Sequence, residues 1–247
     1  MTASPIPDVS ARRGAEVDHD RAARGMFERI APTYDLLNGL LSAGIDRRWR
    51  ARAIRDAALA PRGAALDLCA GTMDLTALIA EARPGQRVVA VDFSPAMLHA
   101  GKHKAPGAEI VVADATDLPF GDGSFSLVTC GFGMRNLGDT ALGAREILRV
   151  LRPGGLFVTL ELFRPERLAT RAFHLAYARA VLPAVGGLVS GDRSAYRYLA
   201  RSMAGFLSRE EYERVLVDVG FRDVSGADLT LGIASVVRAR APERGAR

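Results

Sequence analysis

Three aspartates follow successive apolar runs, and a single glycine follows the first of them. Asp67 lies in LDLCAGTMD, Asp92 in RVVAVDF and Asp114 in EIVVADA. If these runs are parallel strands, their carboxyl ends meet at one edge of a sheet, where such sheets bind their ligands. We therefore expect the three carboxylates to lie near a ligand that carries hydroxyl groups and positive charge.

The loop LDLCAGTMD lacks most of the glycines of a dinucleotide site. A G-x-G-x-x-G loop needs its second glycine where the backbone approaches a pyrophosphate, and here only Gly71 is present. The carboxylate of Asp67 would repel phosphates but attract an ammonium or sulfonium cation. The loop therefore disfavours NAD and predicts S-adenosylmethionine as the cofactor.

The other two aspartates fit the same cofactor. Asp92 stands 21 residues after the loop glycine, where a carboxylate can accept hydrogen bonds from both ribose hydroxyls. Asp114 and Ala115 follow the third strand, where the adenine is expected, and Asp114 or the adjoining backbone would bond its amino group. The alternative is that such aspartates only cap helices or turn the chain. We favour cofactor binding for Asp92 and Asp114, while capping suffices for Asp74 and Asp117.

A doubly wound α/β sheet would bring these residues together. From residue 62, short apolar runs alternate with helical stretches, as in a parallel sheet covered on both faces. Strands are expected at residues 64–69, 87–93, 109–113, 125–131 and 156–163. Helices are expected at residues 20–30, 46–58, 73–81, 95–102, 139–151 and 209–219. The run FRDVSGADLTLGIASVVRAR predicts a terminal antiparallel pair joined around Asp228.

Length and composition indicate one domain. The chain has 247 residues, 49% of them hydrophobic, which suits a single large core. Residues 1–20 mix proline, serine and charge and are expected to form a disordered tail. Residues 21–247 then form the domain, with an N-terminal lid at 21–60 and a substrate-side insertion at 164–208. No apolar run approaches the roughly 20 residues that span a bilayer, so we expect a cytoplasmic protein.

The net charge and the two cysteines do not indicate a nucleic-acid-binding, disulfide-stabilised or metal-binding protein. The net charge is +5, but the arginines are scattered and Lys102 and Lys104 are the only lysines, so we expect no nucleic-acid partner. Cys69 and Cys130 lie in apolar runs, which indicates neither a disulfide framework nor a metal cluster. No bound metal is expected.

The chain resembles the ubiquinone/menaquinone biosynthesis C-methyltransferases over residues 25–240. Its most specific matches are APTYDLLN, FGMRN and GDRSAYRYL, and the segments LDLCAGTMDLT, VDFSPAML and LTLGIASVVRA also match. The resemblance implies a Rossmann-like class I S-adenosylmethionine-dependent methyltransferase with a mostly parallel seven-stranded sheet and a terminal antiparallel pair. It also implies that Thr72, Asp92, Asp114 and Ala115 contact the cofactor, while Asp67 and Gly71 shape the loop.

The implied reaction is methylation of a ring carbon of a prenylated quinol, with demethylmenaquinol as the first choice and menaquinol as the product. One alternative is the benzoquinol of the ubiquinone pathway or another small phenolic acceptor. An alternative of a different class is a non-catalytic protein that binds S-adenosylmethionine or RNA. The apolar, arginine-containing run FHLAYARAVLPAVGGLVSG suits an isoprenoid tail or a membrane surface, although helix packing explains it equally well. Peripheral contact with the inner face of the membrane and a homodimer are left open.

The chain departs from the family pattern at a few positions. Met73 replaces a usual glycine, Gly131 stands where some members have serine, and Ala200 with Arg201 replaces a usual Pro-Glu pair. We expect Met73 to adopt an ordinary negative φ as the first turn of a helix, so that losing the glycine costs nothing. Cofactor binding should survive.

Carbon methylation of a phenolic ring requires the loss of a hydroxyl proton, so that charge reaches the adjacent carbon. Arg135 follows the fourth strand, and its permanent charge could stabilise the phenolate. The alternative is a salt bridge to Asp139 or Glu146. Asn136 could orient the ring oxygens or cap the next helix.

Tyrosines outside the central pattern are the remaining candidates. Tyr34 and Tyr196 could stack on a quinone, bond its oxygens or relay a proton, or they could be buried structural residues. Tyr177 and Tyr198 are assigned to packing. His174 is a weaker candidate for the base, and no single base stands out.

Overall fold

A computed structural model of the chain describes residues 25–166, 170–171, 198 and 201–243, and the structural findings below concern these residues. The predicted tail, the apolar run after residue 171, and Tyr177, Tyr196, His174 and Ala200 lie outside them.

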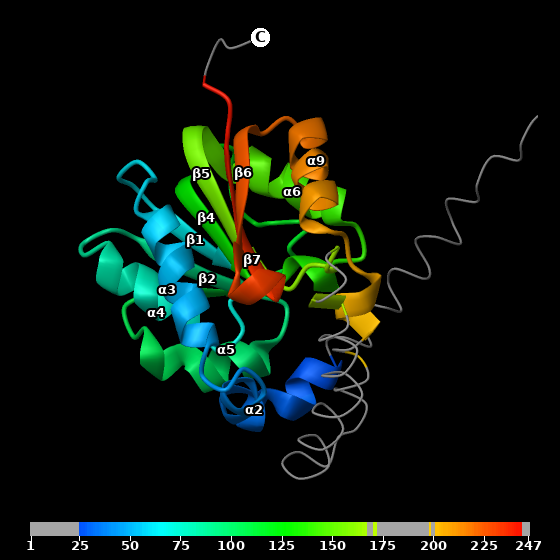
Figure 1. Cartoon of the computed structure of the whole chain (residues 1–247). Coiled ribbons are helices and arrows are strands. Elements are labelled where there is room, and N and C mark those ends of the chain that lie inside the picture. Colours follow the sequence, from blue (N-terminus) through cyan, green and yellow to red (C-terminus); the bar gives the residue numbers. More distant parts are fainter. Residues whose placement is uncertain (1–24, 167–169, 172–197, 199–200, 244–247) are drawn as a thin grey trace, which may run out of the picture.

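One seven-stranded sheet organises the described residues (Figure 1). Its order is β3-β2-β1-β4-β5-β7-β6, and β1 to β5 pair in parallel, while β7 pairs antiparallel to both β5 and β6. The strands are β1 (Ala65–Leu68), β2 (Val88–Asp92), β3 (Glu109–Val112), β4 (Phe125–Gly131), β5 (Leu151–Glu161), β6 (Arg222–Leu229) and β7 (Ala234–Arg240). The expected Rossmann-like α/β fold is confirmed.

Two details of the strands differ from expectation. The terminal pair is joined by the short helix η4 (Thr230–Gly232), a little beyond Asp228. β5 begins at Leu151, earlier than expected, because the run LRPGG, which suggests a turn, continues the strand with a register shift against β4. Neither difference moves the carboxyl ends of the parallel strands.

Helices cover both faces of the sheet. In Figure 1, α3 to α5 lie on one face and α6 and α9 on the other. The helices are α2 (Tyr34–Leu41), α3 (Asp46–Ala57), α4 (Asp74–Ala82), α5 (Pro95–Gly101), α6 (Thr140–Val150) and α9 (Arg209–Val219), with η1 (Ala31–Thr33), η2 (Lys102–Lys104) and η3 (Met134–Asn136). The sequence did not predict α2. None of these helices is long and apolar enough to cross a membrane.

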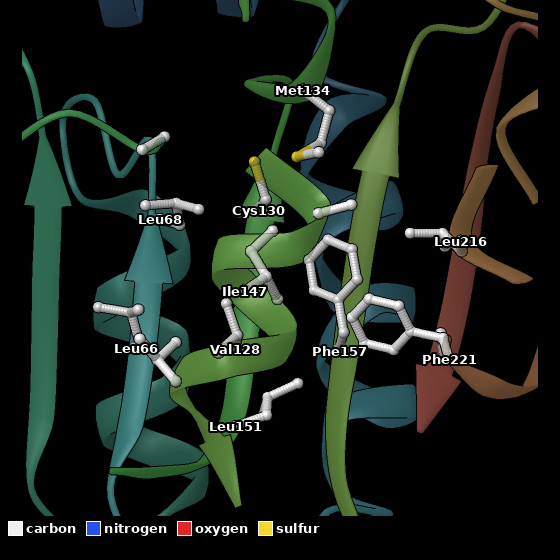
Figure 2. Close-up of a cluster of buried hydrophobic side chains, with 14 of the residues drawn as sticks. Leu66, Leu68, Val128, Cys130, Met134, Ile147, Leu151, Phe157, Leu216 and Phe221 are labelled. Atoms are coloured by element: carbon white, nitrogen blue, oxygen red, sulfur yellow. The ribbon is translucent and has the colours of Figure 1, made fainter. Parts of the chain in front are cut away.

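The larger part of the core lies between the sheet and the pair α6 and α9. Figure 2 shows this cluster, in which side chains from the strands meet those of both helices. Its labelled members include Leu66, Leu68, Val128, Phe157, Ile147 and Leu216. A second cluster under α3 and α4 contains Trp49, Leu75 and Ile79. Packing on both faces holds the strand ends rigidly, which is what a site at the sheet edge requires.

The loop between β1 and α4 contains left-handed residues at alternate positions. Cys69, Gly71 and Met73 have φ values of 54°, 52° and 63°. Our expectation of a negative φ at Met73 is therefore wrong: this residue precedes α4 in the left-handed region, and its amide donates to the carbonyl of Ala70 at 2.8 Å. The tight turn sets this conformation, which explains why glycine is usual here.

A buried side chain offsets the strain at Met73. The left-handed backbone costs an L-residue about 1–2 kcal/mol, whereas burying a methionine side chain contributes about 1.5–3 kcal/mol. Met73 is fully buried and packs with Ala90, Leu98 and Ala105. The loop thus keeps the shape that a glycine would give it, with a larger core beneath.

The strain at position 73 predicts that glycine is more stable there than alanine, the reverse of the order inside a helix. Met73→Ala and Met73→Gly leave nearly the same cavity, but only glycine relieves the left-handed strain. We expect both variants to be less stable than the parent, with Met73→Gly more stable than Met73→Ala by about 1 kcal/mol. Urea unfolding of the three proteins measures this. The control is Ala77→Gly, inside α4, which should be destabilising. If Met73→Ala were more stable than Met73→Gly, the strain argument would be contradicted.

Candidate active site

A cleft opens at the carboxyl edge of the sheet. It has about 780 Å³ of empty space, part of it open to solvent, and we call it the sheet-edge cleft. Its walls include Phe27, Tyr34, Gly71, Asp92, Phe93, Asp114, Ala115, Phe132 and Asn136. The structure therefore brings together four of the residues that the sequence predicts for cofactor binding: Gly71, Asp92, Asp114 and Ala115.

Asp92 connects the ends of β1 and β2. Its Oδ2 accepts a hydrogen bond from the amide of Gly71 at 2.9 Å, and its Oδ1 accepts one from the amide of Ser94 at 2.9 Å. Burial raises the pKa of this carboxyl, against the opposing effect of these amides. Asp92 does not cap α5, because Ser94 does, but its bond to the Ser94 amide does turn the chain. A carboxylate has about four acceptor positions, so Asp92 can still accept bonds from hydroxyl groups in the cleft.

Asp114 both turns the chain and lines the cleft. Its Oδ1 accepts bonds from the amide and the hydroxyl of Thr116, each at 2.7 Å, as in an Asx turn. Ala115 is buried next to it. The turn holds the backbone of both residues against the cleft, where the sequence places an adenine.

Asp67 is a buried carboxylate held by hydroxyl groups. Thr76 and Thr129 donate to its two oxygens at 2.6 and 2.7 Å. Burial raises its pKa to about 6, despite these hydrogen bonds. It forms no ion pair within the described ranges, and it lines a small cavity beside the loop, together with Arg50, Gly71 and Asp74, which we call the loop cavity. Negative charge here is available to a cation.

Thr72 connects the loop to the N-terminal segment. Its hydroxyl donates to Asp35 at 2.5 Å, and Asp35 also pairs with Lys104, which pairs with Asp74 at 2.6 Å. Burial raises the pKa of Asp35, but Lys104 and Thr72 outweigh it and the net shift is downward. The hydroxyl of Thr72 is thus engaged within the protein, and its role in binding a cofactor stays a prediction. Asp35 was not anticipated from the sequence.

Arg135 is buried in an ion pair that the sequence did not predict. Its Nη1 donates to Glu161 Oε1 at 2.5 Å and to the carbonyl of Phe132 at 2.7 Å. Burial lowers the pKa of the guanidinium, but Glu161 outweighs this effect and the pKa is raised. Both alternatives proposed from the sequence are wrong: Asp139 caps α6 and Glu146 pairs with Arg149.

Asn136 lies one residue further along η3 and does not cap α6. Its Nδ2 donates to the carbonyl of Phe132 at 3.2 Å, and its Oδ1 accepts the hydroxyl of Tyr198 at 3.1 Å. Tyr198 was assigned to packing, yet its hydroxyl reaches the turn that carries Arg135. Since Tyr196 is outside the described residues, Tyr34 and Tyr198 are the tyrosines that the structure places at the site.

A larger apolar cavity adjoins the cleft. It has about 1060 Å³ of empty space, part of it open to solvent, and its walls include Leu41, Ile45, Trp49, Leu162, Met203 and Ile233, with the charged residues Asp46, Arg50 and Arg135. Tyr34 and Phe132 line this apolar cavity, the sheet-edge cleft and the loop cavity alike. Phe132 has a φ of 59°, a strained conformation of the kind that clusters at functional sites. It was not singled out from the sequence, although it lies within the specific block FGMRN.

Because Gly131 has no side chain, Leu75 packs directly against the backbone at this junction. A Cβ atom there would lie 2.5 Å from Leu75 Cδ1, so the serine of some relatives would require Leu75 to move. The junction thus joins a cleft with polar groups to an apolar cavity with a buried cation at its wall. Such an arrangement suits transfer of a small group between two ligands, one in each space.

Comparison with known proteins gives the family. The ubiE/COQ5 methyltransferase family matches residues 15–240. The chain belongs to this family. It is 45% identical to a demethylmenaquinone methyltransferase of Thermus thermophilus over 85% of this chain and 97% of that one. It is 41% identical to a ubiquinone/menaquinone biosynthesis C-methyltransferase of Geotalea daltonii, covering 85% and 92%.

Solved structures agree on the fold of this ubiE/COQ5 family member. A methyltransferase of Thermotoga maritima, described as a possible histamine N-methyltransferase, has a TM-score of 0.65 at 18% identity, covering 88% of this chain and 99% of that one. The [4+2]-cyclase SpnF has a TM-score of 0.68 at 15% identity, covering 91% and 97%. Since one fold serves both a methyltransferase and a cyclase, the reaction must be argued from the site.

The raised pKa of Asp67 predicts a pH-dependent contribution to stability. A carboxyl whose pKa is higher in the folded state contributes most below its unfolded value of 3.8 and loses that contribution as pH rises through about 6. At one pKa unit per 1.36 kcal/mol, the stability of Asp67→Asn relative to the parent should rise by roughly 2–3 kcal/mol between pH 4 and 7.

Denaturant unfolding at several pH values measures this difference. The matched control is Asp218→Asn, because Asp218 lies exposed on α9 and its variant should show no such rise. A difference between Asp67→Asn and the parent that stays constant from pH 4 to 7 would contradict the assignment.

Proposed function

We propose that this protein is an S-adenosylmethionine-dependent C-methyltransferase that converts demethylmenaquinol to menaquinol. The observation that carries the proposal is the junction at Tyr34 and Phe132, where the sheet-edge cleft meets the apolar cavity beside the buried Arg135. The names of the relatives from Thermus thermophilus and Geotalea daltonii support the choice of reaction.

The residues of the cleft fit S-adenosylmethionine, which supplies an activated methyl group when bound. Asp92 can accept the ribose hydroxyls, and the buried carboxylate of Asp67 places negative charge beside the loop. Gly71 lines the cleft with a φ of 52°, a left-handed conformation that favours glycine, and its backbone carries no side chain that a ligand would meet. The turn at Asp114 and Ala115 offers backbone polar groups to the adenine.

The apolar cavity fits the ring and tail of a prenylated quinol. Its aliphatic and aromatic walls provide an environment for isoprenoid groups, and burial of each methylene contributes about 0.8 kcal/mol. Arg135 can stabilise the ring oxygen as it loses its proton, because a fixed charge in a dry site interacts strongly with developing charge. Tyr34 can contact both ligands and hold the ring carbon in line with the cleft.

Other acceptors are distinguished by experiment. The benzoquinol of the ubiquinone pathway would use the same cavity, and so would another small phenol. A non-catalytic protein would bind S-adenosylmethionine without turnover, and an RNA-binding protein would show binding that falls steeply with salt. Contact with the membrane surface belongs to the proposal, because a prenylated substrate resides in a membrane. A cytoplasmic location and a homodimer stay predictions from the sequence.

The direct test is transfer of a labelled methyl group from S-adenosylmethionine to chemically reduced demethylmenaquinone. We expect label on the ring carbon of menaquinol, identified by mass spectrometry of the product. A demethylated benzoquinol and a non-prenylated phenol serve as competing acceptors, and oxidised demethylmenaquinone serves as a control that lacks the phenolic hydroxyl. Label in the benzoquinol alone would overturn the choice of substrate, and label in no quinol would overturn the proposed reaction.

Two substitutions separate cofactor binding from turnover. Asp92→Ala should abolish S-adenosylmethionine binding, because it removes both the predicted ribose contact and the acceptor of the Gly71 amide. Arg135→Ala should bind the cofactor within about threefold of the parent but lower kcat by about 10²–10³-fold, the usual cost of removing an oxyanion-stabilising donor. Calorimetry and initial rates measure these effects.

Arg87→Ala is the control for this pair, because Arg87 forms an exposed ion pair with Glu109 away from the site. It should change neither quantity. Unchanged cofactor affinity in Asp92→Ala, or an unchanged rate in Arg135→Ala, would exclude the role assigned to that residue.

A further inference from the structure

The carboxylate of Glu161 holds both the backbone and the side chain of Arg135. The carboxylate accepts the guanidinium Nη1 at 2.5 Å and the amide of Arg135 at 3.2 Å, and it also accepts the amide of Leu162 at 2.8 Å. The ends of β4 and β5 lie side by side, since Gly131 pairs with Leu160. Glu161 thus fixes the turn after β4 and the orientation of the arginine at once.

Stability alone does not account for this pair. Glu161 is fully buried and the side chain of Arg135 is 7% exposed. Buried ion pairs contribute little net stability, and well-packed apolar residues often replace them without loss, whereas removal of one partner is costly. A buried pair at the wall of a ligand-sized cavity is therefore better explained by what its charged groups do there.

The pair leaves part of the guanidinium without a protein partner. The side-chain hydrogen bonds of Arg135 within the described part of the chain come from Nη1, and its buried Nε has no partner. Arg135 lines the apolar cavity beside Tyr34, whereas Glu161 is not among the residues of that wall. Glu161 can therefore influence a ligand in the cavity through Arg135 and through the backbone of Leu162, and of these two only Arg135 carries a charge.

We propose that Glu161 is a positioning residue of the methyl transfer, holding the Arg135 guanidinium so that its charge meets the ring oxygen of the quinol. This inference rests on the proposed function. Before the quinol loses its proton, Arg135 and Glu161 together carry no net charge. This keeps the free-energy cost of burying the two side chains beside the cavity low. As charge develops on the ring oxygen, the guanidinium is already oriented toward it and need not reorganise.

A double-mutant cycle tests the proposal. Glu161→Gln should lower kcat by about 10²-fold, with the KM for the quinol and the Kd for S-adenosylmethionine within about threefold of the parent. In the Arg135→Met background, Glu161→Gln should lower kcat no further, because a residue that acts through Arg135 loses its effect once Arg135 is gone. The loss of kcat should persist above the pH at which the kcat of the parent has risen, because removing the Glu161 charge by itself makes the phenol easier to ionise and cannot account for a slower reaction.

Two further variants make the test sharp. Glu161→Asp keeps the charge with a shorter reach and should give a kcat between those of the parent and Glu161→Gln; it replaces the glutamine variant if that one does not fold. Glu146→Gln is the matched control, because Glu146 also pairs with an arginine and accepts a backbone amide, but far from the cavity. It should leave kcat and the pH profile unchanged.

Each other outcome has a defined meaning. An unchanged kcat in Glu161→Gln or Glu161→Asp, or an equal loss of kcat with and without Arg135, overturns the positioning role. If the parent methylates no quinol at all, the proposed function fails, and the role of Glu161 fails with it. If the parent is active and the Glu161 variants have the same kcat as the parent, only the inference about Glu161 is rejected.

Discussion

The site depends on one buried carboxylate, that of Asp92, which holds two strand ends in a fixed relation. Its oxygens accept the amides of Gly71 and Ser94, so the loop after β1 and the turn after β2 share one acceptor. Burial makes this carboxyl harder to ionise, and the amides that it accepts offset part of that effect. The loop, the cleft and the start of α5 are therefore positioned together by the same group.

The left-handed residues show the cost of this geometry. Met73, buried beneath the loop after β1, and Phe132, in the wall of the cleft, both have positive φ without being glycine. Tertiary structure holds each in place: Met73 is anchored by its buried side chain, and the carbonyl of Phe132 accepts from Arg135 and Asn136. Strain of this kind persists only where surrounding contacts determine the backbone.

The fold was largely predictable because its signals are local. Apolar runs and helical periodicity gave the parallel strands and α9, and the positions of Gly71, Asp92, Asp114 and Ala115 at strand ends follow from that pattern. The conformation of Met73 was predicted wrongly, since propensity favours a helical φ and the turn overrides it; the glycine that is usual at this position was the signal for a positive φ. The partners of Arg135 and Thr72 were missed because Glu161 and Asp35 are distant in sequence, and no spacing rule connects them.

The shared walls of the cavities have a thermodynamic consequence. Tyr34 and Phe132 each border the sheet-edge cleft, the loop cavity and the apolar cavity, so a ligand that contacts these rings in one space also contacts part of the wall of the next. Linkage then requires reciprocity: the factor by which a first ligand strengthens binding of a second is the factor by which the second strengthens the first. Cooperativity between two small molecules in this protein needs no subunit contact and no domain movement, only two aromatic side chains that belong to both sites.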